Sequence, residues 1–340
     1  MSARPARART TTLPTAPRPG ARRRAASAVV VGLLGALLAG CTGGAYRDTP
    51  LPTASPGPTS TAAPAAPSAP VECADPLASY DPAGVDPGAV PPGSTMALIR
   101  DRGRLVVGVS ADSLLLGARD PVSGSIEGFD IDMARLVAQA IFGDPDRVEL
   151  RVITAAQRIP SLQDGTVDLV ARNMTITCAR WEEIAFSAEY YRSGQKVLVP
   201  LGSTATSLDD LAGRRVCAPA GTSSLAKLEE DFPEVEPVAA ATHTDCLVRF
   251  QQGEVDAITG DDTVLAGLAA QDPYAQVVGA AFTSEPYGLG VNAEAVDLVR
   301  FVNAVLDRAK ADGTWAASYD RWLAEALGPA PAPPASVYGR

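Results

Sequence analysis

The run Leu105-Val106-Val107-Gly108-Val109-Ser110 and the segment Asp130–Phe142 that follows it indicate how this chain folds. The first is an apolar run, rich in valine, with the length expected of a β-strand. In the second, apolar residues recur every three or four positions from Met133 to Ile141, so they share one face of a helix. A strand followed by an amphipathic helix is the repeating unit of α/β proteins.

The same alternation continues to about residue 328. A second helical pattern, Glu294–Asp312, is followed by Gly313, a typical helix stop. Strands that alternate with helices predict α/β layers with largely parallel sheets, and about 230 residues suit two lobes better than one domain. The further strand-like runs, rich in Val, Ile and Leu and bounded by Gly, Pro or Asp, are Glu149–Ile153, Asp168–Ala171, Lys196–Val199, Arg215–Ala218, Asp256–Thr259, Gln276–Val278 and Gly288–Asn292.

The first forty residues have the pattern of a secretory signal. Seven arginines lie before residue 25, no acidic residue occurs among residues 1–40, and an uncharged apolar run closes as Leu38-Ala39-Gly40-Cys41. The run is too short and too rich in Gly and Ala for a comfortable membrane span. A cysteine directly after Leu-Ala-Gly resembles a bacterial lipobox, in which the thiol is diacylated and the cysteine becomes the new N-terminus.

We therefore expect residues 1–40 to be removed and the mature protein to be anchored to the outer face of the cell membrane by a lipidated Cys41. An unlipidated signal or a signal anchor is the alternative. The run Arg22-Arg23-Arg24 leaves Sec and twin-arginine export both open.

Removal of the leader changes the charge of the chain. The leader holds seven of the 29 basic residues and none of the 39 acidic ones, so the remainder carries 22 basic and 39 acidic residues, a formal net charge of −17. Such an acidic chain argues against nucleic acid as a partner. No second apolar run long enough to span a bilayer follows, so the chain is not a permease.

Four cysteines remain besides the lipidated one. Outside the cell an even number predicts two disulfides, with three pairings, and four buried free thiols are the alternative. We favour Cys217–Cys246 and Cys73–Cys178, because the first closes a loop of about 30 residues, worth roughly 3–4 kcal/mol, and the second fastens the N-terminal segment to the body. No CxxC occurs, which argues against a zinc or thioredoxin-type site.

The two ends of the mature chain are poor in core-forming residues. From Thr42 to about Pro70 the chain is almost entirely Pro, Ala, Thr, Ser and Gly, which predicts an extended linker. We assign residues 41–95 to the lipidated cysteine and the linker, and residues 329–340 to a Pro-rich tail.

Signatures of enzymes are scarce in this sequence. The chain has one histidine, His243, and neither HExxH, nor GxSxG, nor a P-loop, so we predict no catalytic residues, no metal and no cofactor. Polar residues instead follow several strands, where α/β folds bind ligands. They are Arg158, the run Asn173–Thr177 with Arg180, the run Gly221–Ser224, and Asp261-Asp262.

Each of these groups also has an ordinary structural explanation. A lone arginine is usually a solvated surface charge, and Gly-Thr-Ser-Ser before a helix is usually an N-cap. Two aspartates before a helix compensate its dipole. A threonine in a strand is more often a filler than a ligand contact.

Taken together, several stretches resemble the family 3 extracellular solute-binding proteins, the receptors of polar amino-acid ABC transporters. The resemblance covers residues from about 100 to 328 and is nearest to actinobacterial glutamate-, aspartate- and glutamine-binding lipoproteins, some of which are linked to amino-acid sensing. The stretches that carry it are Gly128-Phe129-Asp130-Ile131-Asp132, Arg158–Gly165, Asn173–Arg180, Gly221-Thr222-Ser223-Ser224, and Asp312–Leu323 with its Gly-Thr-Trp and Tyr-Asp-Arg-Trp elements.

The resemblance implies a two-lobed, type II periplasmic-binding-protein-like fold that closes on its ligand. Two mixed, mostly parallel sheets would be joined by a two-segment hinge near Val199–Leu201 and Ala281–Glu285. Lobe 1 would comprise residues 96–199 and 284–328, and lobe 2 residues 200–283.

The resemblance also implies a set of residues around a free amino acid. Arg180 takes the position of the carboxylate clamp, where a guanidinium forms two parallel charge-assisted bonds. Thr175, Thr222 and Ser223 would complete the carboxylate cage, the latter two at a helix start. The Asn173 carbonyl and Asp261 would accept from the ammonium group.

The side-chain end of the ligand is set by other residues. Arg158 lies where relatives that bind Glu and Asp place an arginine against the distal carboxylate, and His243 lies where such receptors have a histidine. Arg119 and Arg172 would add positive field. We therefore favour glutamate or aspartate over the amides, with a helix cap or surface residue as the alternative for His243. The segment Ser110–Leu114, Pro219 and Gly260 depart from the family pattern.

We predict a monomeric, non-enzymatic receptor that delivers an acidic amino acid to an ABC permease. A sensor subunit that signals through a membrane partner and a Ser/Thr kinase is the alternative. A remote alternative is a dehydratase-like enzyme on the same fold, which would need an acid–base pair that the predicted site lacks.

Overall fold

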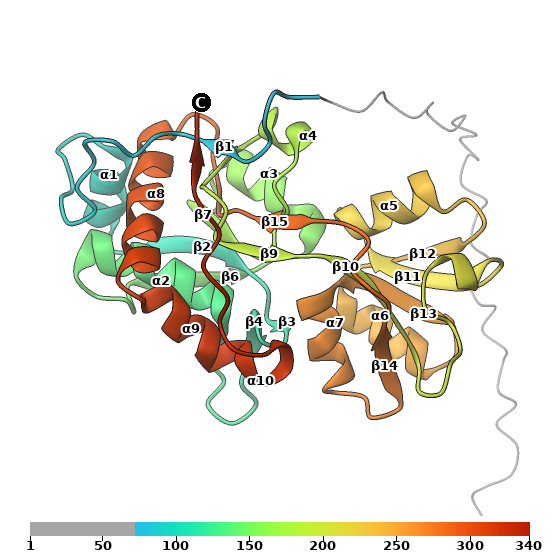
Figure 1. Cartoon of the computed structure of the whole chain (residues 1–340). Helices are drawn as coiled ribbons and strands as arrows, with labels where there is room; N and C mark the ends of the chain where they lie inside the picture. The colour runs from blue at the N-terminus through green and yellow to red at the C-terminus, as the bar shows by residue number, and fades with distance from the viewer. Residues whose placement is uncertain (1–71) are drawn as a thin grey trace, which may run out of the picture. The chain divides into compact units, whose positions relative to one another are not determined.

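The computed structural model describes residues 72–340 (Figure 1). By their internal contacts, the described residues form one compact unit. The predicted signal, Cys41 and most of the predicted linker lie outside the described residues. Within residues 72–340, none of the helices combines the length and the apolar composition that a bilayer crossing needs.

The first sheet is mixed. β2 pairs in parallel with β6 and with β7, whereas β16 runs antiparallel to both of its neighbours, β7 and β8. Because β8 is antiparallel to β16, it runs with the other three, so four of the five strands share one direction. The strand order is β6 (Val148–Val152), β2 (Leu105–Val109), β7 (Leu169–Ala171), β16 (Gly290–Val291) and β8 (Ala185–Phe186).

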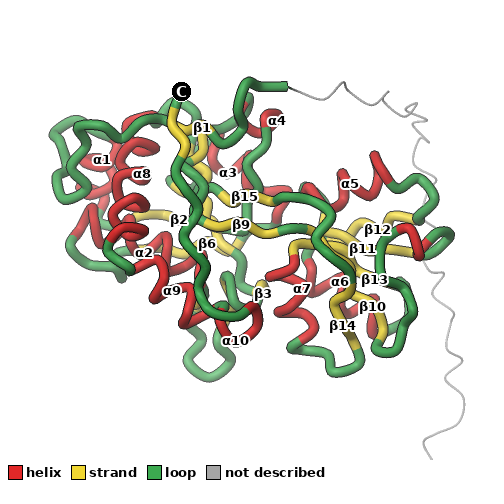
Figure 2. Tube along the Cα trace, in the orientation of Figure 1, coloured by secondary structure: helices red, strands yellow, loops and turns green. Residues whose placement is uncertain are grey.

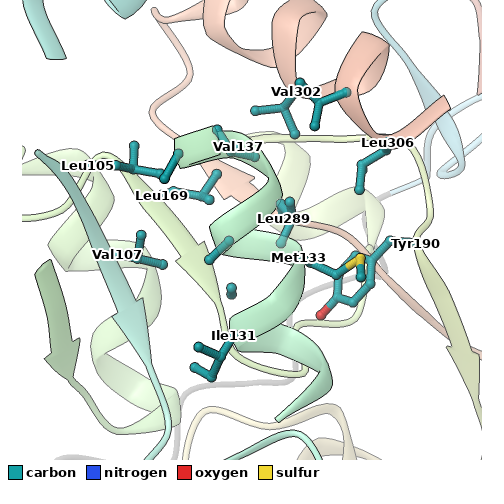
Figure 3. Close-up of a cluster of buried hydrophobic side chains, with 14 of the residues drawn as sticks. Leu105, Val107, Ile131, Met133, Val137, Leu169, Tyr190, Leu289, Val302 and Leu306 are labelled. Carbon is teal, nitrogen blue, oxygen red and sulfur yellow. The ribbon is translucent and has the colours of Figure 1, made fainter. Parts of the chain in front are cut away.

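Helices α2 (Phe129–Phe142) and α8 (Val296–Ala311) bury their apolar faces against this sheet. Figure 3 shows Val137 of α2 between Leu169 of the sheet and Val302 of α8, and Met133 of the same helix next to Tyr190. Burial of such a side chain stabilises the fold by roughly 1.5–3 kcal/mol. We call the elements around this sheet lobe 1.

The second sheet repeats the arrangement. β11 is parallel to β12 and β13, and β10 runs antiparallel to β13 and β14, so again four of five strands share a direction. We call the elements around it lobe 2, and both sheets agree with the predicted fold. The strands, in order, are β12 (Glu236–Ala240), β11 (Arg215–Pro219), β13 (Ala257–Asp261), β10 (Gln195–Pro200) and β14 (Ala275–Val278), and the helices are α5 (Ser223–Asp231), α6 (His243–Gln251) and α7 (Asp262–Ala269).

Two antiparallel strands, β9 (Tyr191–Ser193) and β15 (Glu285–Tyr287), connect the lobes (Figures 1 and 2). The sequence placed the first hinge segment near Val199–Leu201. The structure places the change of sheet earlier, between Ser193 and Gln195, because β10 already pairs with β13 of the second sheet.

The remaining elements are short, apart from two helices of lobe 1. The strands of a three-stranded sheet follow β2 and precede α2 in the sequence, and one-turn helices occur in several loops. These elements are β3 (Asp112–Ser113), β4 (Gly117–Arg119), β5 (Ile126–Glu127), α1 (Thr95–Arg102), η1 (Ala155–Gln157), α3 (Arg158–Gln163), α4 (Cys178–Trp181), η2 (Asp209–Leu211), α9 (Thr314–Trp322) and α10 (Ala324–Leu327).

The two ends of the described chain pack on lobe 1. β1 (Ala78–Ser79) pairs in parallel with β17 (Val337–Tyr338), whereas the sequence assigned both segments to a linker and a tail. The Tyr338 hydroxyl donates to Asp307 of α8 at 2.6 Å, which explains why a Pro-rich segment is held against the body. Both predicted disulfides, Cys73–Cys178 and Cys217–Cys246, are present.

Candidate functional site

The predicted ligand residues, except Arg119, come together where the two lobes meet. Arg172 and Asn173 directly follow β7 of lobe 1, Thr222 and Ser223 form the start of α5 after β11, and Asp261 ends β13. In open α/β sheets the loops after the carboxyl ends of parallel strands form the ligand site. The strand ends of both lobes therefore supply one candidate site.

Gly221 forms a direct contact between the lobes. Its carbonyl accepts from Nη2 of Arg158 at 2.8 Å and from Nη2 of Arg180 at 3.2 Å. Gly221 has φ of +74°, and a Cβ built there would lie 2.7 Å from the Cα of Ala156 in η1. Glycine is therefore required both by the backbone conformation and by the close approach of the other lobe.

Arg158 opens α3 and is buried among backbone carbonyls. Besides its bond to Gly221, its Nε donates to Ala155 at 2.9 Å and its Nη1 contacts the carbonyls of Arg172 and Asn173 at 3.2 and 3.1 Å. A guanidinium has five N–H groups. Four are engaged, so Arg158 offers a ligand a single donor and no bidentate grip in this conformation.

Arg180 lies on α4 and is more accessible than Arg158. Its Nη1 donates to the Thr175 carbonyl at 2.6 Å, and no ion pair of the described residues includes it. Burial lowers the pKa of Arg180, while the charges of Glu285 and Asp261 act in the opposite direction. Its positive charge is thus held at the junction without a direct carboxylate partner.

Glu285 is a member of the site that the sequence reasoning missed. It lies in the connecting strand β15, is 4% exposed, and its Oε2 accepts from the hydroxyls of Thr175 at 2.7 Å and Ser223 at 2.8 Å. Its Oε1 accepts from Nε2 of Gln195 at 2.9 Å. The carboxylate, which lies on the connecting strand β15, therefore bonds to residues of both lobes. Its only sequence signal is an acidic residue directly before the apolar run Pro286–Val291.

Thr222 contributes differently from its neighbour. Its hydroxyl donates to the Pro219 carbonyl at 2.6 Å and accepts from the amide of Leu225 at 3.2 Å, so it caps α5. The first amides of a helix have no carbonyl partner within the helix. Thr222 thus holds the α5 N-terminus in place and leaves backbone N–H groups as the donors there.

Asp261 is buried beside Glu285. Tyr287 donates its hydroxyl to Oδ2, and Oδ1 has no partner. Burial, with a further contribution from the Glu285 charge, raises the pKa of Asp261 to about 7. This carboxyl is therefore poised to change its protonation when a cation is placed next to it.

His243, at the start of α6, is neutral at pH 7. Burial, supported by the positive charge of Arg172, lowers the pKa of His243 to about 4. A Cβ on Gly260 would lie 2.6 Å from Nε2 of His243, so the ring lies against the backbone next to Asp261. This departure from the family pattern at Gly260 makes room for the histidine.

Unpaired buried atoms concentrate at this junction. Five side-chain atoms of the described residues are buried without a hydrogen-bond partner, and one of them is Nε of Arg135 on α2. An unmade bond costs roughly 1–3 kcal/mol, so such atoms mark places for a polar ligand. The other four, all from residues at the lobe junction, are Asn173 Oδ1, Gln195 Oε1, His243 Nε2 and Asp261 Oδ1.

Two of the predicted cations do not act as expected. Arg172 is buried, donates to the Ile153 carbonyl at 2.8 Å, and has Asp112 and Asp130 as opposing charges. Arg119 is exposed on β4, where its Nη1 donates to Gly124 at 2.6 Å, and the structure does not bring it to the other site residues. The positive charge that Arg172 was expected to add to the ligand site is therefore offset by Asp112 and Asp130, and the charge of Arg119 lies elsewhere.

Comparison with known proteins identifies the family. Residues 105–325 match the model of bacterial extracellular solute-binding proteins, family 3. The chain belongs to this family. Its members bind solutes outside the cytoplasm, in agreement with the resemblance noted from the sequence.

The curated relatives include binding proteins for two amino acids. The glutamine-binding protein GlnH of an ABC transporter from Bacillus subtilis is 37% identical over 232 residues, which is 68% of this chain and 85% of GlnH. The glutamate-binding protein GluB from Corynebacterium efficiens is 33% identical over 242 residues, 67% of this chain and 80% of GluB.

Solved structures show the same fold. An ancestral arginine-binding protein bound to glutamine has a TM-score of 0.62 at 32% identity, and the match covers 65% of this chain and 98% of that one. A variant of the arginine-binding protein from T. maritima has a TM-score of 0.63 at 29% identity, covering 67% and 99%. The predicted type II fold is confirmed.

Proposed function

We propose that this family 3 protein is a lipid-anchored extracytoplasmic receptor that binds a polar L-amino acid, glutamate, aspartate or one of their amides, for delivery to an ABC permease. The observation that carries the proposal is the Arg180 guanidinium, which has no ion-pair partner among residues 72–340 and donates to the same Gly221 carbonyl as Arg158. Glutamine- and glutamate-binding relatives support the ligand class.

The α-carboxylate of the ligand binds to Arg180 and to the N-terminus of α5. A guanidinium and a carboxylate form charge-assisted bonds of roughly 1.5–3 kcal/mol each. The backbone N–H groups of Thr175 and Ser223 complete the cage from the two lobes, and the α5 dipole favours the negative charge. Because the donors come from both lobes, carboxylate binding favours the closed arrangement.

The ammonium group of the ligand binds next to Asp261. The unpaired Oδ1 of Asp261 and the unpaired Oδ1 of Asn173 are acceptors that an ammonium can satisfy. Binding of a cation there stabilises the ionised form of Asp261, so the bound state lowers the pKa that burial has raised. Glu285 adds a second negative charge close to the same group.

The distal end of the ligand meets Arg158 and His243. The one remaining N–H of Arg158 fits a single oxygen, which a carboxylate and an amide both present. The unpaired Nε2 of His243 adds an acceptor for an amide N–H if its Nδ1 carries the proton. We therefore expect glutamate and glutamine affinities within about tenfold of each other, because one hydrogen bond is worth roughly 1 kcal/mol, whereas the sequence favoured the acids over the amides.

Calorimetry of the full chain in detergent micelles tests the proposal. Wild type should bind glutamate, glutamine, aspartate or asparagine with micromolar affinity, which corresponds to about −8 kcal/mol. Arg180→Ala should abolish binding of all four. Arg119→Ala is the matched control, because this exposed arginine bonds only within its own hairpin, and its affinity should equal wild type.

Unchanged affinity in Arg180→Ala would remove the carboxylate assignment. A loss in Arg119→Ala would instead restore the sequence-based role of that residue. Binding of a sugar or a metal chelate, with none of the four amino acids, would overturn the ligand class.

A further inference from the structure

The helix that carries Arg180 is too short to hold itself in place. α4 has four residues, Cys178–Trp181, none of which is fully buried. Its local support is the Thr177 cap, whose hydroxyl accepts from the Arg180 amide at 3.2 Å, and the backbone bonds of a single turn, such as those from the Trp181 amide to the Thr177 carbonyl at 3.1 Å and from the Ile184 amide to the Arg180 carbonyl at 3.0 Å. One helical turn is not stable by itself, so other segments must fix the direction of Arg180.

The ring of Phe186 in β8 lies 5.5 Å from that of Trp181 and supplies part of that support. The two ends of the described chain supply another part, and they contact the residues on both sides of Arg180. Cys178 is joined to Cys73 by a disulfide. The indole Nε1 of Trp181 donates to the Pro76 carbonyl at 2.8 Å, and the Arg340 guanidinium lies 4.0 Å above the centre of the Trp181 ring. Figure 1 shows α4 close to β1, next to the C-terminal strand.

These terminal segments are themselves fastened to lobe 1. Ser79 of β1 donates to the Phe186 carbonyl at 2.7 Å, and β1 pairs with β17. In the C-terminal segment, Ser336 and Tyr338 both donate to Asp307 of α8 at 2.6 Å. Because the terminal segments are anchored on a core helix and on the first sheet, their contacts can restrict the orientation of α4.

We propose that residues 73–80 and 336–340, which we call the terminal clamp, position Arg180 and thereby set the affinity for the ligand carboxylate. The inference rests on the proposed function, in which Arg180 binds that carboxylate. Cys73, Trp181 and Arg340 act through α4 and touch no ligand, so they are positioning residues. Reduction of the Cys73–Cys178 disulfide releases the clamp and weakens ligand binding.

The test measures amino-acid affinity by calorimetry of the full chain in detergent micelles. Two changes loosen the clamp: Cys73→Ala with Cys178→Ala, and Trp181→Phe, which keeps an aromatic ring but removes the N–H bonded to Pro76. If α4 then holds its orientation about a tenth of the time, the apparent Kd rises about tenfold. Trp181→Phe decides the question if the cysteine variant fails to fold.

Trp315→Phe is the matched control for Trp181→Phe. The Trp315 indole also donates to a backbone carbonyl, that of Tyr190 at 2.7 Å, but in the lobe 1 core. The thermal stability of Trp315→Phe should fall while its affinity for the amino acid stays at the wild-type value. An equal affinity loss in Trp315→Phe, or wild-type affinity in both clamp variants, would overturn the inference.

The Arg180→Lys background separates a positioning role from a general one. A lysine is a flexible point charge that lacks the guanidinium fork, so a clamp that acts through Arg180 has little left to position. The effect of the cysteine change should shrink from about tenfold to less than threefold there. The same factor in both backgrounds would refute the inference. Wild-type affinity in Arg180→Lys and Arg180→Ala together would refute the proposed function instead.

Discussion

Gly221→Ala tests whether the lobes meet as the structure shows. Gly221 combines a left-handed backbone with a close approach to lobe 1, because an added Cβ would lie 2.7 Å from Cα and 3.0 Å from N of Ala156. These are backbone atoms, so no side-chain rotation relieves the contact. The clash acts only when the lobes are together, whereas the backbone strain acts within lobe 2 at all times.

The two effects have different magnitudes and different readouts. A non-glycine residue in the left-handed region costs about 1–2 kcal/mol, which lowers the stability of lobe 2. The clash adds roughly 1–3 kcal/mol to the closed form, as overpacking does in a core, and this corresponds to a Kd raised roughly five- to 150-fold. We therefore expect loss of both stability and affinity.

Gly213→Ala is the matched control. Gly213 lies in lobe 2 with φ of +70°, and a Cβ there meets no atom within 4 Å. Thermal unfolding should show a similar loss of stability in both variants, and calorimetry should show weaker binding in Gly221→Ala alone. Equal affinities in the two variants would refute the closed contact between Gly221 and Ala156 in the bound protein.

Two further predictions concern protonation and anchoring. Because burial raises the pKa of Asp261 from 3.8 to about 7, the folded protein keeps a proton that the unfolded chain releases between these values. In denaturant titrations without ligand, the free energy of unfolding should therefore fall from pH 4 to pH 7 by up to about 1.4 kcal/mol per pH unit relative to Asp261→Asn; parallel curves would contradict this. Cys41→Ser should move the chain from the membrane fraction to the medium, as judged by immunoblotting, and retention in the membrane would exclude lipidation as the anchor.

Features of this fold that depend on local interactions could be predicted from the sequence, whereas those that depend on distant contacts could not. The strand Leu105–Val109 and the helix from Phe129 to Phe142 follow from local apolar periodicity, and the structure has them within one or two residues of the predicted bounds. Arg119 shows the opposite case. The residues next to Arg119 in the sequence do not indicate that its side chain bonds to Gly124 within the hairpin and does not reach the lobe junction.

Apolar spacing, turn residues and the order of motifs in the sequence were sufficient to predict the α/β class and the family, because each is a pattern that can be read along the chain. The sequence only favoured the two disulfides among three possible pairings. Only the tertiary structure decided that Glu285 joins Thr175 to Ser223. The same is true of the bonds between the Arg158 guanidinium and backbone carbonyls, and of the contacts between the chain ends and α4. These contacts join residues up to more than a hundred positions apart. Their free energy depends on burial and geometry that arise only after both lobes have folded.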